Sequence, residues 1–181
     1  MKVKVLFLTN NDNSMVLYHW LAEREEVVRC SDPLNLEMVK NIRPEIIVSY
    51  NYKYILSSEV IDYMEGKIYN LHISLLPWNR GSNPNYWSFV ENTPKGVTIH
   101  QINAGLDTGE MIAQEEMFFD EKEESFSSTY KKLNDKIVEL FMQNWMDIKN
   151  GSYKLTRQQG KGSYHTVKDF RRFTEKNPVD W

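Results

Sequence analysis

The sequence predicts an α/β fold with a Rossmann-like, mostly parallel, twisted sheet, and three observations support this prediction. Short apolar runs alternate with segments of helical period along the first half of the chain, a pattern typical of βαβ units. Two later strands are joined by a short loop that contains glycine, which predicts an antiparallel hairpin after the fourth strand. A long helix then carries apolar residues at helical spacing from Ser125 to Lys149, and Gly151 stands where a helix should stop.

The predicted elements follow one another with short connections. Strands are expected at Lys2–Leu8, Glu26–Cys30, Glu45–Ser49, Lys67–Ser74, Gly96–Asn103 and Met111–Phe119. Helices are expected at Met15–Arg24, Leu36–Ile42, Ile55–Met64 and Asn83–Glu91, before the long helix. We therefore expect one main domain over residues 1–150 and a C-terminal tail over residues 151–181 that packs on or beside the functional site.

Composition argues against several classes of protein. The 181 residues carry a formal net charge of −3, whereas a dedicated nucleic-acid binder has a basic surplus, so no nucleic-acid partner is expected. Basic residues do cluster in the C-terminal tail, which is either a solvated segment or an anion-binding one. Cys30 is the only cysteine, so no intrachain disulfide can form. No signal peptide and no membrane-spanning run are found, so we expect a cytoplasmic protein.

The fourth strand carries three polar residues on one face. Side chains alternate between the two faces of a strand, so Asn70, His72 and Ser74 point the same way. A strand inside a parallel sheet is normally apolar on both faces, and open α/β sheets bind ligands at the carboxyl ends of their strands. Pro77 places the three residues near that end. The pattern fits a ligand site, and equally an edge strand with one wet face.

A loop bracketed by glycines carries one acidic residue. In the segment NAGLDTG, Gly105 and Gly109 flank Asp107, so the backbone can turn tightly and fix the carboxylate. By itself this segment is more typical of a hairpin turn with an exposed aspartate than of a site. One Asn, one His and one Asp together suit acyl transfer to an amine: the amide donates to an oxyanion, the imidazole moves a proton, and the carboxylate orients the imidazole.

Other chemistry is not indicated. The four histidines show no paired ligand spacing, so no metal is expected. We interpret His100, which shares a predicted strand with Thr98, as a structural residue. No GxGxxG or Walker loop is present, so neither nicotinamide nor ATP binding is predicted.

The motifs in this region resemble those of a known family. Four motifs occur in order between Asn70 and Gln114, namely NLHISLLPWNRG, NPNYW, GVTIH and GLDTG. Their order resembles the 10-formyltetrahydrofolate-dependent formyltransferases. The resemblance implies the formyltransferase fold and 10-formyltetrahydrofolate as the formyl donor, with no metal. It also implies a catalytic set of Asn70, His72 and Asp107.

The resemblance assigns roles to these residues and walls to a folate pocket. Asn70 would stabilise the oxyanion, His72 would accept or relay a proton, and Asp107 would hold His72 and a water in place. The pocket would be lined on one side by the segment after the third strand and on the other by the loop before Asp107. The wall residues are Tyr54, Ile55, Leu56, Asn103, Ala104 and Gly105.

The resemblance leaves several acceptors of the formyl group, all of them amines. The loop Thr9–Ser14 contains no glycine, unlike the glycine–serine phosphate loop of the glycinamide ribonucleotide enzymes. We also expect no counterpart of the additional RNA-binding domain of the methionyl-tRNA enzymes, because only residues 151–181 follow the long helix. The segment from Trp78 to Trp87 looks most like the enzymes that formylate nucleotide-linked amino sugars, typically dTDP-linked sugars for surface polysaccharides. The residues assigned to this small substrate are Ser74, Arg80, Asn83, Tyr164 and His165.

Alternatives stay open at this point. The chain could formylate glycinamide ribonucleotide after all. It could be a formyltetrahydrofolate hydrolase that uses the same three residues with water, or a catalytically silent folate-binding module. Formation of a homodimer is likewise left open.

Overall fold

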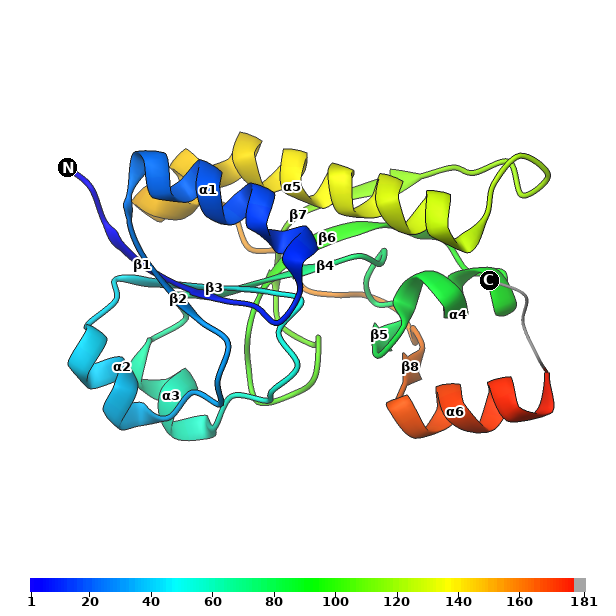
Figure 1. Cartoon of the computed structure of the whole chain (residues 1–181), viewed down its shortest axis with the longest axis horizontal. Helices are drawn as coiled ribbons and strands as arrows, with labels where there is room; N and C mark the ends of the chain where they lie inside the picture. The colour runs from blue at the N-terminus through cyan, green and yellow to red at the C-terminus, as the bar shows by residue number, and fades with distance from the viewer. Residues whose placement is uncertain (178–181) are drawn as a thin grey trace.

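The computed structural model describes residues 1–177, and these form a six-stranded sheet with helices on both faces (Figure 1). The strands of this sheet are β1 (Lys4–Leu8), β2 (Glu26–Cys30), β3 (Ile46–Tyr50), β4 (Ile68–His72), β6 (Lys95–Gln101) and β7 (Met111–Met117). They lie in the order β2-β1-β3-β4-β6-β7. β1 to β4 are parallel, whereas β6 is antiparallel to both of its neighbours. The predicted mixed sheet with an antiparallel hairpin is confirmed.

The helices divide between the two faces of the sheet (Figure 1). One face is covered by α1 (Met15–Arg24), which follows the short 3₁₀ turn η1 (Asp12–Ser14), and by the long α5 (Phe126–Asn150). The other face is covered by α2 (Leu36–Ile42) and α3 (Ser58–Tyr63). α5 ends at Gly151, whose φ of +66° is the left-handed conformation that glycine adopts readily at helix ends.

The central strands are buried on both faces, which explains their nearly continuous apolar sequences. In β1, Val5 and Phe7 belong to the core under α1 and α5, whereas Leu6 and Leu8 belong to the smaller core under α2 and α3. All four side chains are 0% exposed. The period of two along a strand thus supplies both cores from one short segment.

β6 pairs along the edge of β4 and places side chains beside the polar ones of that strand. Its register places His100 opposite Asn70 and Thr98 opposite His72. Side chains directly opposite on antiparallel strands have Cβ atoms about 5 Å apart, so they touch. The register of β6 with β7 shifts between Ile99 and His100, at the same place. Residues distant in the sequence are therefore paired where β4 ends.

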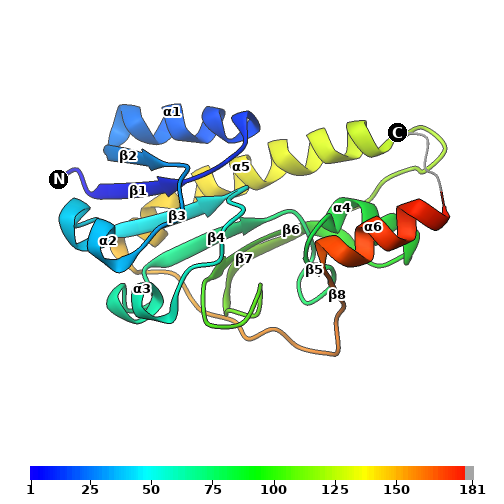
Figure 2. The ribbon, with the colours of Figure 1, turned by 60° about the horizontal axis from the view of Figure 1, so that its bottom comes forward.

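After α5 the chain returns to the sheet as an extended segment, residues 152–165, which we call the C-terminal arm. Thr156 exchanges two backbone hydrogen bonds with Met111 at the start of β7. The short strand β8 (Tyr164–His165) then pairs in parallel with β5 (Arg80–Gly81). Figure 2 shows the arm, in orange, running from α5 past β7 to β8.

The end of the arm and the helix after it pack against the helix that follows β5. The rings of Trp87 and His165 stack with centroids 4.0 Å apart. Trp87 belongs to α4 (Pro84–Val90), and its ring also meets Phe173 of α6 (Val167–Lys176). The last four residues of the predicted tail, 178–181, lie outside the described residues.

Some predicted bounds differ from those observed. The helix predicted over Ile55–Met64 begins only at Ser58, because Ser57 is an extended N-cap residue with φ −71° and ψ 153°. The fourth strand ends at His72, so Ser74 lies in the turn that follows. Within residues 1–177, no helix combines the length and apolar character needed to cross a membrane.

A buried carboxylate joins the N-terminal end of the sheet to the end of α5. Glu25 is 4% exposed and accepts hydrogen bonds from the Val3 N–H at 2.8 Å, Trp145 Nε1 at 3.1 Å and Lys149 Nζ at 2.6 Å. Burial raises the pKa of Glu25, but these three donors and the Lys149 charge outweigh it and hold the pKa below its usual value.

We expect Glu25→Gln to lower the free energy of unfolding by about 2 kcal/mol at pH 7, because hydrogen bonds to a charged group contribute roughly 1.5–3 kcal/mol. Since the folded-state pKa lies below the unfolded value, this stabilisation is present above the unfolded pKa and is lost as the pH falls through the folded pKa. The difference between wild type and variant should therefore shrink toward about pH 4 and below. Urea unfolding across this pH range measures it.

The matched control is Glu23→Gln, a carboxylate whose side chain is 73% exposed and pairs only with neighbouring Arg24 among the described residues. It should change the free energy of unfolding by less than about 0.5 kcal/mol. An equal loss in the two variants would contradict the role given to Glu25.

Candidate active site

A cavity of about 680 Å³ opens at the carboxyl ends of β3 and β4. Asn51 lines it from the end of β3, and Asn70 and His72 line it from β4. The loop after β6 contributes residues 102–107, and the chain at the end of the arm contributes residues 164–167. Ligands of open α/β sheets bind at this edge, where the loops after the strands diverge.

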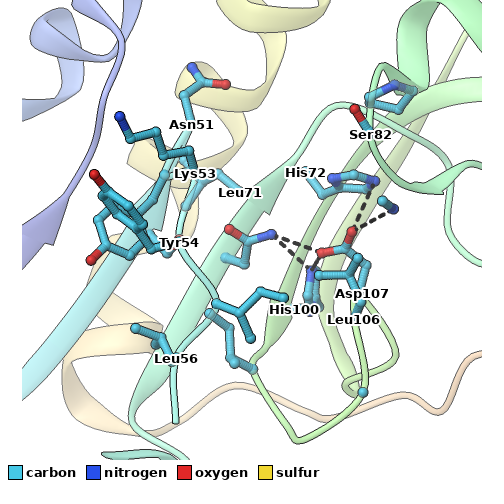
Figure 3. A pocket seen from close by; sticks show the side chains of 18 of the residues that line it. Asn51, Lys53, Tyr54, Leu56, Leu71, His72, Ser82, His100, Leu106 and Asp107 are labelled. Carbon is cyan, nitrogen blue, oxygen red and sulfur yellow. Dashed lines mark hydrogen bonds and ion pairs between the residues drawn. The ribbon is translucent and has the colours of Figure 1, made fainter. Parts of the chain in front are cut away.

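Asp107 lies within a hydrogen-bonded cluster in this cavity (Figure 3). Its Oδ1 accepts a hydrogen bond from Asn70 Nδ2 at 3.2 Å and lies 3.4 Å from His100 Nε2. Its Oδ2 accepts from the Gly81 N–H at 2.8 Å and lies 3.7 Å from His72 Nε2. Figure 3 shows the side chains of His72, His100 and Asp107 pointing toward one another. β4, β5 and β6 thus each supply a partner to one carboxylate.

The cluster keeps Asp107 ionised although it is only 9% exposed. Burial raises the pKa of the carboxyl group, since the charged form loses water. The charge of His72, the hydrogen bond and charge of His100, and the Gly81 N–H outweigh burial. Together they hold the pKa of Asp107 well below its usual range, so the site contains a fixed negative charge.

Hydrogen bonding assigns the protons of His100. Its Nδ1 lies 2.8 Å from the carbonyl oxygen of Gln101, which can only accept, so Nδ1 carries hydrogen. Nε2 faces both the Asn70 amide nitrogen at 3.3 Å and Asp107 Oδ1 at 3.4 Å. In the neutral ring Nε2 accepts from Asn70, whereas in the imidazolium it donates to Asp107. Protonation of His100 therefore releases one N–H of the Asn70 amide.

The same reasoning identifies the basic nitrogen of His72. Nε2 lies 3.0 Å from the carbonyl oxygen of Asn79, so Nε2 carries hydrogen and the neutral ring has its lone pair on Nδ1. Asn79 is itself fixed, because its Nδ2 donates to Thr93 Oγ1 at 2.7 Å and Ser163 Oγ accepts from its N–H at 2.8 Å. The proton-accepting atom of this imidazole is therefore Nδ1.

Most of the residues assigned to a site from the sequence line this one cavity. They are Tyr54, Ile55, Leu56, Asn70, His72, Asn83, Asn103, Ala104, Gly105, Asp107, Tyr164 and His165. Ser74 and Arg80 are not among the lining residues. Ser74 is 2% exposed, and its carbonyl accepts from Thr98 Oγ1. The Arg80 guanidinium donates twice to Gln158 Oε1, from Nε at 3.0 Å and from Nη2 at 2.8 Å.

Two residues at the site escaped the sequence-based interpretation. His100 was expected to be structural, yet it lines the cavity and contacts Asp107. Alternation along a strand predicts its face, but not that β6 pairs with β4. Gln158 donates from Nε2 to the carbonyls of Asp107 and Gly109, at 2.8 and 2.9 Å. No periodic pattern marks it, because the arm is extended and mostly exposed. Among residues 1–177, no cluster of three or more His, Cys, Asp or Glu side chains could hold a metal ion.

Glycine lets the Asp107 loop lie directly against β6. A Cβ on Gly109 would stand 1.7 Å from the carbonyl oxygen of Gln101, a backbone atom that cannot turn away. At Gly105 the nearest atom would be Oγ1 of the exposed Thr108 side chain, at 2.2 Å, and none of the three nearest atoms is a backbone atom. Asp107 itself has φ +51°, a left-handed conformation that costs an L-residue about 1 kcal/mol. The close packing around the loop holds Asp107 in this conformation.

Fold and site together define an α/β protein with a buried Asn–His–Asp cluster beside a ligand-sized cavity. Residues 8–144 match the formyl transferase family. The chain belongs to this family.

Relatives with different acceptors share the match. A methionyl-tRNA formyltransferase of Fusobacterium nucleatum is 34% identical over 147 residues, which cover 81% of this chain and 46% of the relative. A dTDP-4-amino-4,6-dideoxyglucose formyltransferase of Mycobacterium tuberculosis is 33% identical over 128 residues, which cover 71% of this chain and 53% of the relative. The chain spans about half the length of the curated relatives it matches.

One solved structure matches the chain over nearly its full length. The formyltransferase PseJ from Anoxybacillus kamchatkensis, in complex with UDP-4,6-dideoxy-4-formamido-L-AltNAc and tetrahydrofolate, superposes with a TM-score of 0.88 at 36% identity. The match covers 98% of this chain and 93% of the PseJ chain. The C-terminal arm therefore lies within the part of the chain that has a counterpart in PseJ.

We expect Gly109→Ala to lower the free energy of unfolding by about 2 kcal/mol or more, because the added methyl group would push the loop away from the backbone of Gln101. Amide hydrogen exchange should also become faster over residues 103–110. Gly105→Ala, in the same loop, meets the exposed side chain of Thr108 and no backbone atom, so it should cost less than Gly109→Ala. Equal destabilisation by the two variants would show that the Gly109 contact does not fix the loop.

Proposed function

We propose that this chain transfers a formyl group from 10-formyltetrahydrofolate to the amine of a nucleotide-linked amino sugar. The observation that carries the proposal is the near full-length likeness to PseJ, a formyltransferase whose structure holds tetrahydrofolate and a UDP-linked formamido sugar. Membership of the formyl transferase family supports the reaction, and the dTDP-sugar relative supports the class of acceptor. The cavity supplies the groups that such a reaction needs.

The formyl donor would lie between two walls of the cavity. One wall consists of Tyr54, Ile55 and Leu56, and the other of Asn103, Ala104 and Gly105. Ile55 is 85% exposed and Leu106, beside the second wall, is 44% exposed. Exposed apolar side chains that line a cavity gain most when a flat ring system covers them. A pterin ring would do so.

The reaction would follow from the cluster around Asp107. The amine nitrogen attacks the formyl carbon, the carbonyl electrons move to oxygen, and an N–H of Asn70 stabilises the oxyanion. His72 Nδ1 takes the proton that the amine loses and passes it to N10 of the folate as the bond from the formyl carbon to N10 breaks. The Asn70 N–H that faces His100 Nε2, at 3.3 Å, is the one that would turn to the oxyanion, since the other donates to Asp107.

The acceptor would occupy the end of the cavity near α4 and the arm. Asn83, Tyr164 and His165 line that end and are the proposed contacts of the sugar or its phosphates. Ser74 and Arg80 do not line the cavity, so they would act on the acceptor only through their neighbours. In this proposal residues 1–150 are the catalytic domain and the tail 151–181 completes the acceptor side.

Other parts of the sequence-based hypothesis stay predictions. They are the cytoplasmic location, the role in surface polysaccharide synthesis and the homodimer. The nucleotide also stays a prediction: dTDP was expected, whereas the sugar bound in PseJ carries UDP.

An acceptor panel tests the proposal. The purified chain is incubated with 10-formyltetrahydrofolate and, in separate reactions, with UDP- and dTDP-linked 4-amino and 3-amino sugars, glycinamide ribonucleotide, methionyl-tRNA, or no amine. Tetrahydrofolate release is followed by absorbance and the formylated product by mass spectrometry. We expect release that depends on an amino sugar.

The other outcomes identify the alternatives. Release of formate without any amine would identify a hydrolase, and formylation of methionyl-tRNA or glycinamide ribonucleotide in preference to every sugar would overturn the proposed acceptor. Folate binding without turnover would identify a silent binding module.

Replacing His72 by Ala should lower kcat/KM by about 100-fold or more, because the group that accepts the amine proton is lost. The folate affinity, measured by calorimetry with tetrahydrofolate, should change by less than about threefold, since the ring belongs to neither proposed wall. Near-normal turnover in the variant would exclude the role of His72. His19→Ala, at a histidine of α1 that does not line the cavity, is the control.

The pH profile should separate Asp107 from the other titrating groups. The pKa of Asp107 is held well below its usual range, so its charge is lost only as the pH falls through that low value. Any fall of kcat/KM on the acid side above about pH 5 must then come from another group, and Asp107→Asn should lower the rate at every pH while leaving that fall in place. Disappearance of the acid limb in the variant would contradict the assignment.

A further inference from the structure

A closed circuit of hydrogen bonds runs through Asp107 and the C-terminal arm. The Gly81 N–H donates to Asp107 Oδ2 at 2.8 Å, and its chain neighbour Arg80 donates twice to Gln158 Oε1, at 3.0 and 2.8 Å. Gln158 Nε2 then donates to the carbonyl of Asp107 at 2.8 Å. We call this set of four residues the Asp107 circuit. It holds one residue of the site by both its carboxylate and its backbone.

Gln158 uses all the hydrogen-bonding groups of its side chain in these contacts. Besides the carbonyl of Asp107, its Nε2 reaches the carbonyl of Gly109 at 2.9 Å. The amide thus places two donors on the loop and one acceptor under the guanidinium of Arg80. Only a side-chain amide offers donors and an acceptor in this arrangement, because a carboxylate has no donor and an ammonium has no acceptor.

Gln158 adds backbone contacts to a loop that is mostly exposed, beyond those that the Asp107 carboxylate and Asn103 make. Residues 103–106 and 108 are exposed, and the two buried members of the loop are Asp107 and Gly109, the two whose carbonyls Gln158 binds. Asp107 also has a left-handed backbone, with φ +51°. A strained residue persists only where its surroundings determine its conformation. The two hydrogen bonds from Gln158 to the carbonyls of Asp107 and Gly109 help to hold Asp107 in this conformation.

The arm is anchored to the rest of the protein both before and after Gln158. Thr156 is fixed to Met111 by two backbone hydrogen bonds, at 2.8 and 2.9 Å. On the other side Ser163 Oγ accepts from the Asn79 N–H and donates to Asn79 Oδ1, and β8 pairs with β5. Gln158 lies between these anchors and beyond residue 144, where the match to the formyl transferase family ends.

We propose that Gln158 is a positioning residue for the reaction, which sets the place of the Asp107 carboxylate between His72 and His100. This inference rests on the proposed function for its kinetic consequence and on the Asp107 circuit for its structural one. Gln158 touches no reacting atom. It acts through the backbone of Asp107. If this backbone shifts, the Asp107 carboxylate changes its distance to the imidazoles of His72 and His100.

The folate wall in the same loop has its own hydrogen bonds. Asn103 Oδ1 accepts from the Gly105 N–H at 3.0 Å and from Thr108 Oγ1 at 2.8 Å. Loss of the Gln158 contacts should therefore move Asp107 more than residues 103–105. The kinetic signature is a fall in kcat with little change in the KM for the folate donor.

The test compares Gln158→Glu with Gln159→Glu. The first keeps the acceptor for Arg80 but replaces both donors to the loop carbonyls by an oxygen, and the second makes the same change at the exposed neighbour. We expect Gln158→Glu to lower kcat by about tenfold or more, with the donor KM within about threefold, because misplacement of a group near the reacting atoms by 1 Å can cost about 100-fold. Gln159→Glu should leave both within about twofold of wild type.

A second readout needs no turnover. Exchange of the Gly81 amide hydrogen, followed by NMR, should become about tenfold faster in Gln158→Glu, because its acceptor on Asp107 is no longer fixed. Gln158→Met, which adds no charge, should do the same, and circular dichroism should show both variants folded. Exchange of the Gly81 amide at the wild-type rate in both variants overturns the proposal, whatever kcat does. If the wild-type chain formylates no amine, the proposed function fails, and the exchange experiment still decides whether Gln158 positions Asp107.

Discussion

The site depends on keeping one ionised carboxylate out of water. Taking a charge into a protein interior costs several kcal/mol unless charged partners and hydrogen bonds replace the lost water. Asp107, at 9% exposure, finds those partners on three separate strands: Asn70 and His72 on β4, Gly81 on β5 and His100 on β6. The cluster is stable only while all three strands keep their places. The geometry of the site therefore depends directly on the packing of these strands.

The antiparallel hairpin brings the partners of Asp107 together more directly than another parallel strand would. In a parallel sheet the polar carboxyl ends of strands meet at one edge, but each strand arrives there through its own helix. β6 instead runs antiparallel to β4, so His100 lies opposite Asn70. The strand ends one residue later, and the loop that carries Asp107 follows directly. Strand pairing and loop close the same cluster, and Gly109 lets the loop approach β6 without a side chain between them.

Most of the fold could be predicted from local pattern, and the residues of the candidate site only partly. Strands such as β1 are apolar on both faces because two cores flank them, and alternation places Asn70 and His72 on one face. The alternation of side chains does not predict which strand pairs with β4. The sequence therefore gives no sign that His100 lies beside Asn70. The arm was harder still. Gln158 acts through single hydrogen bonds to residues far away in the sequence, and such contacts leave no periodic trace.

The arm also constrains how such a protein can change its acceptor. Under the proposed function, the segment that holds Tyr164 and His165 against the acceptor end of the cavity is continuous with the one that holds Gln158 against the Asp107 loop. An insertion between them could alter the acceptor wall freely only if the anchors of Gln158, at Thr156 on one side and Ser163 on the other, kept their partners. Variation in the acceptor is therefore easiest beyond β8, where α6 begins beside the cavity and no residue of the Asp107 circuit follows. Under the proposed function, the position of Gln158 before β8 and of Tyr164 and His165 within β8 would let one extended segment serve both the reaction and the choice of acceptor.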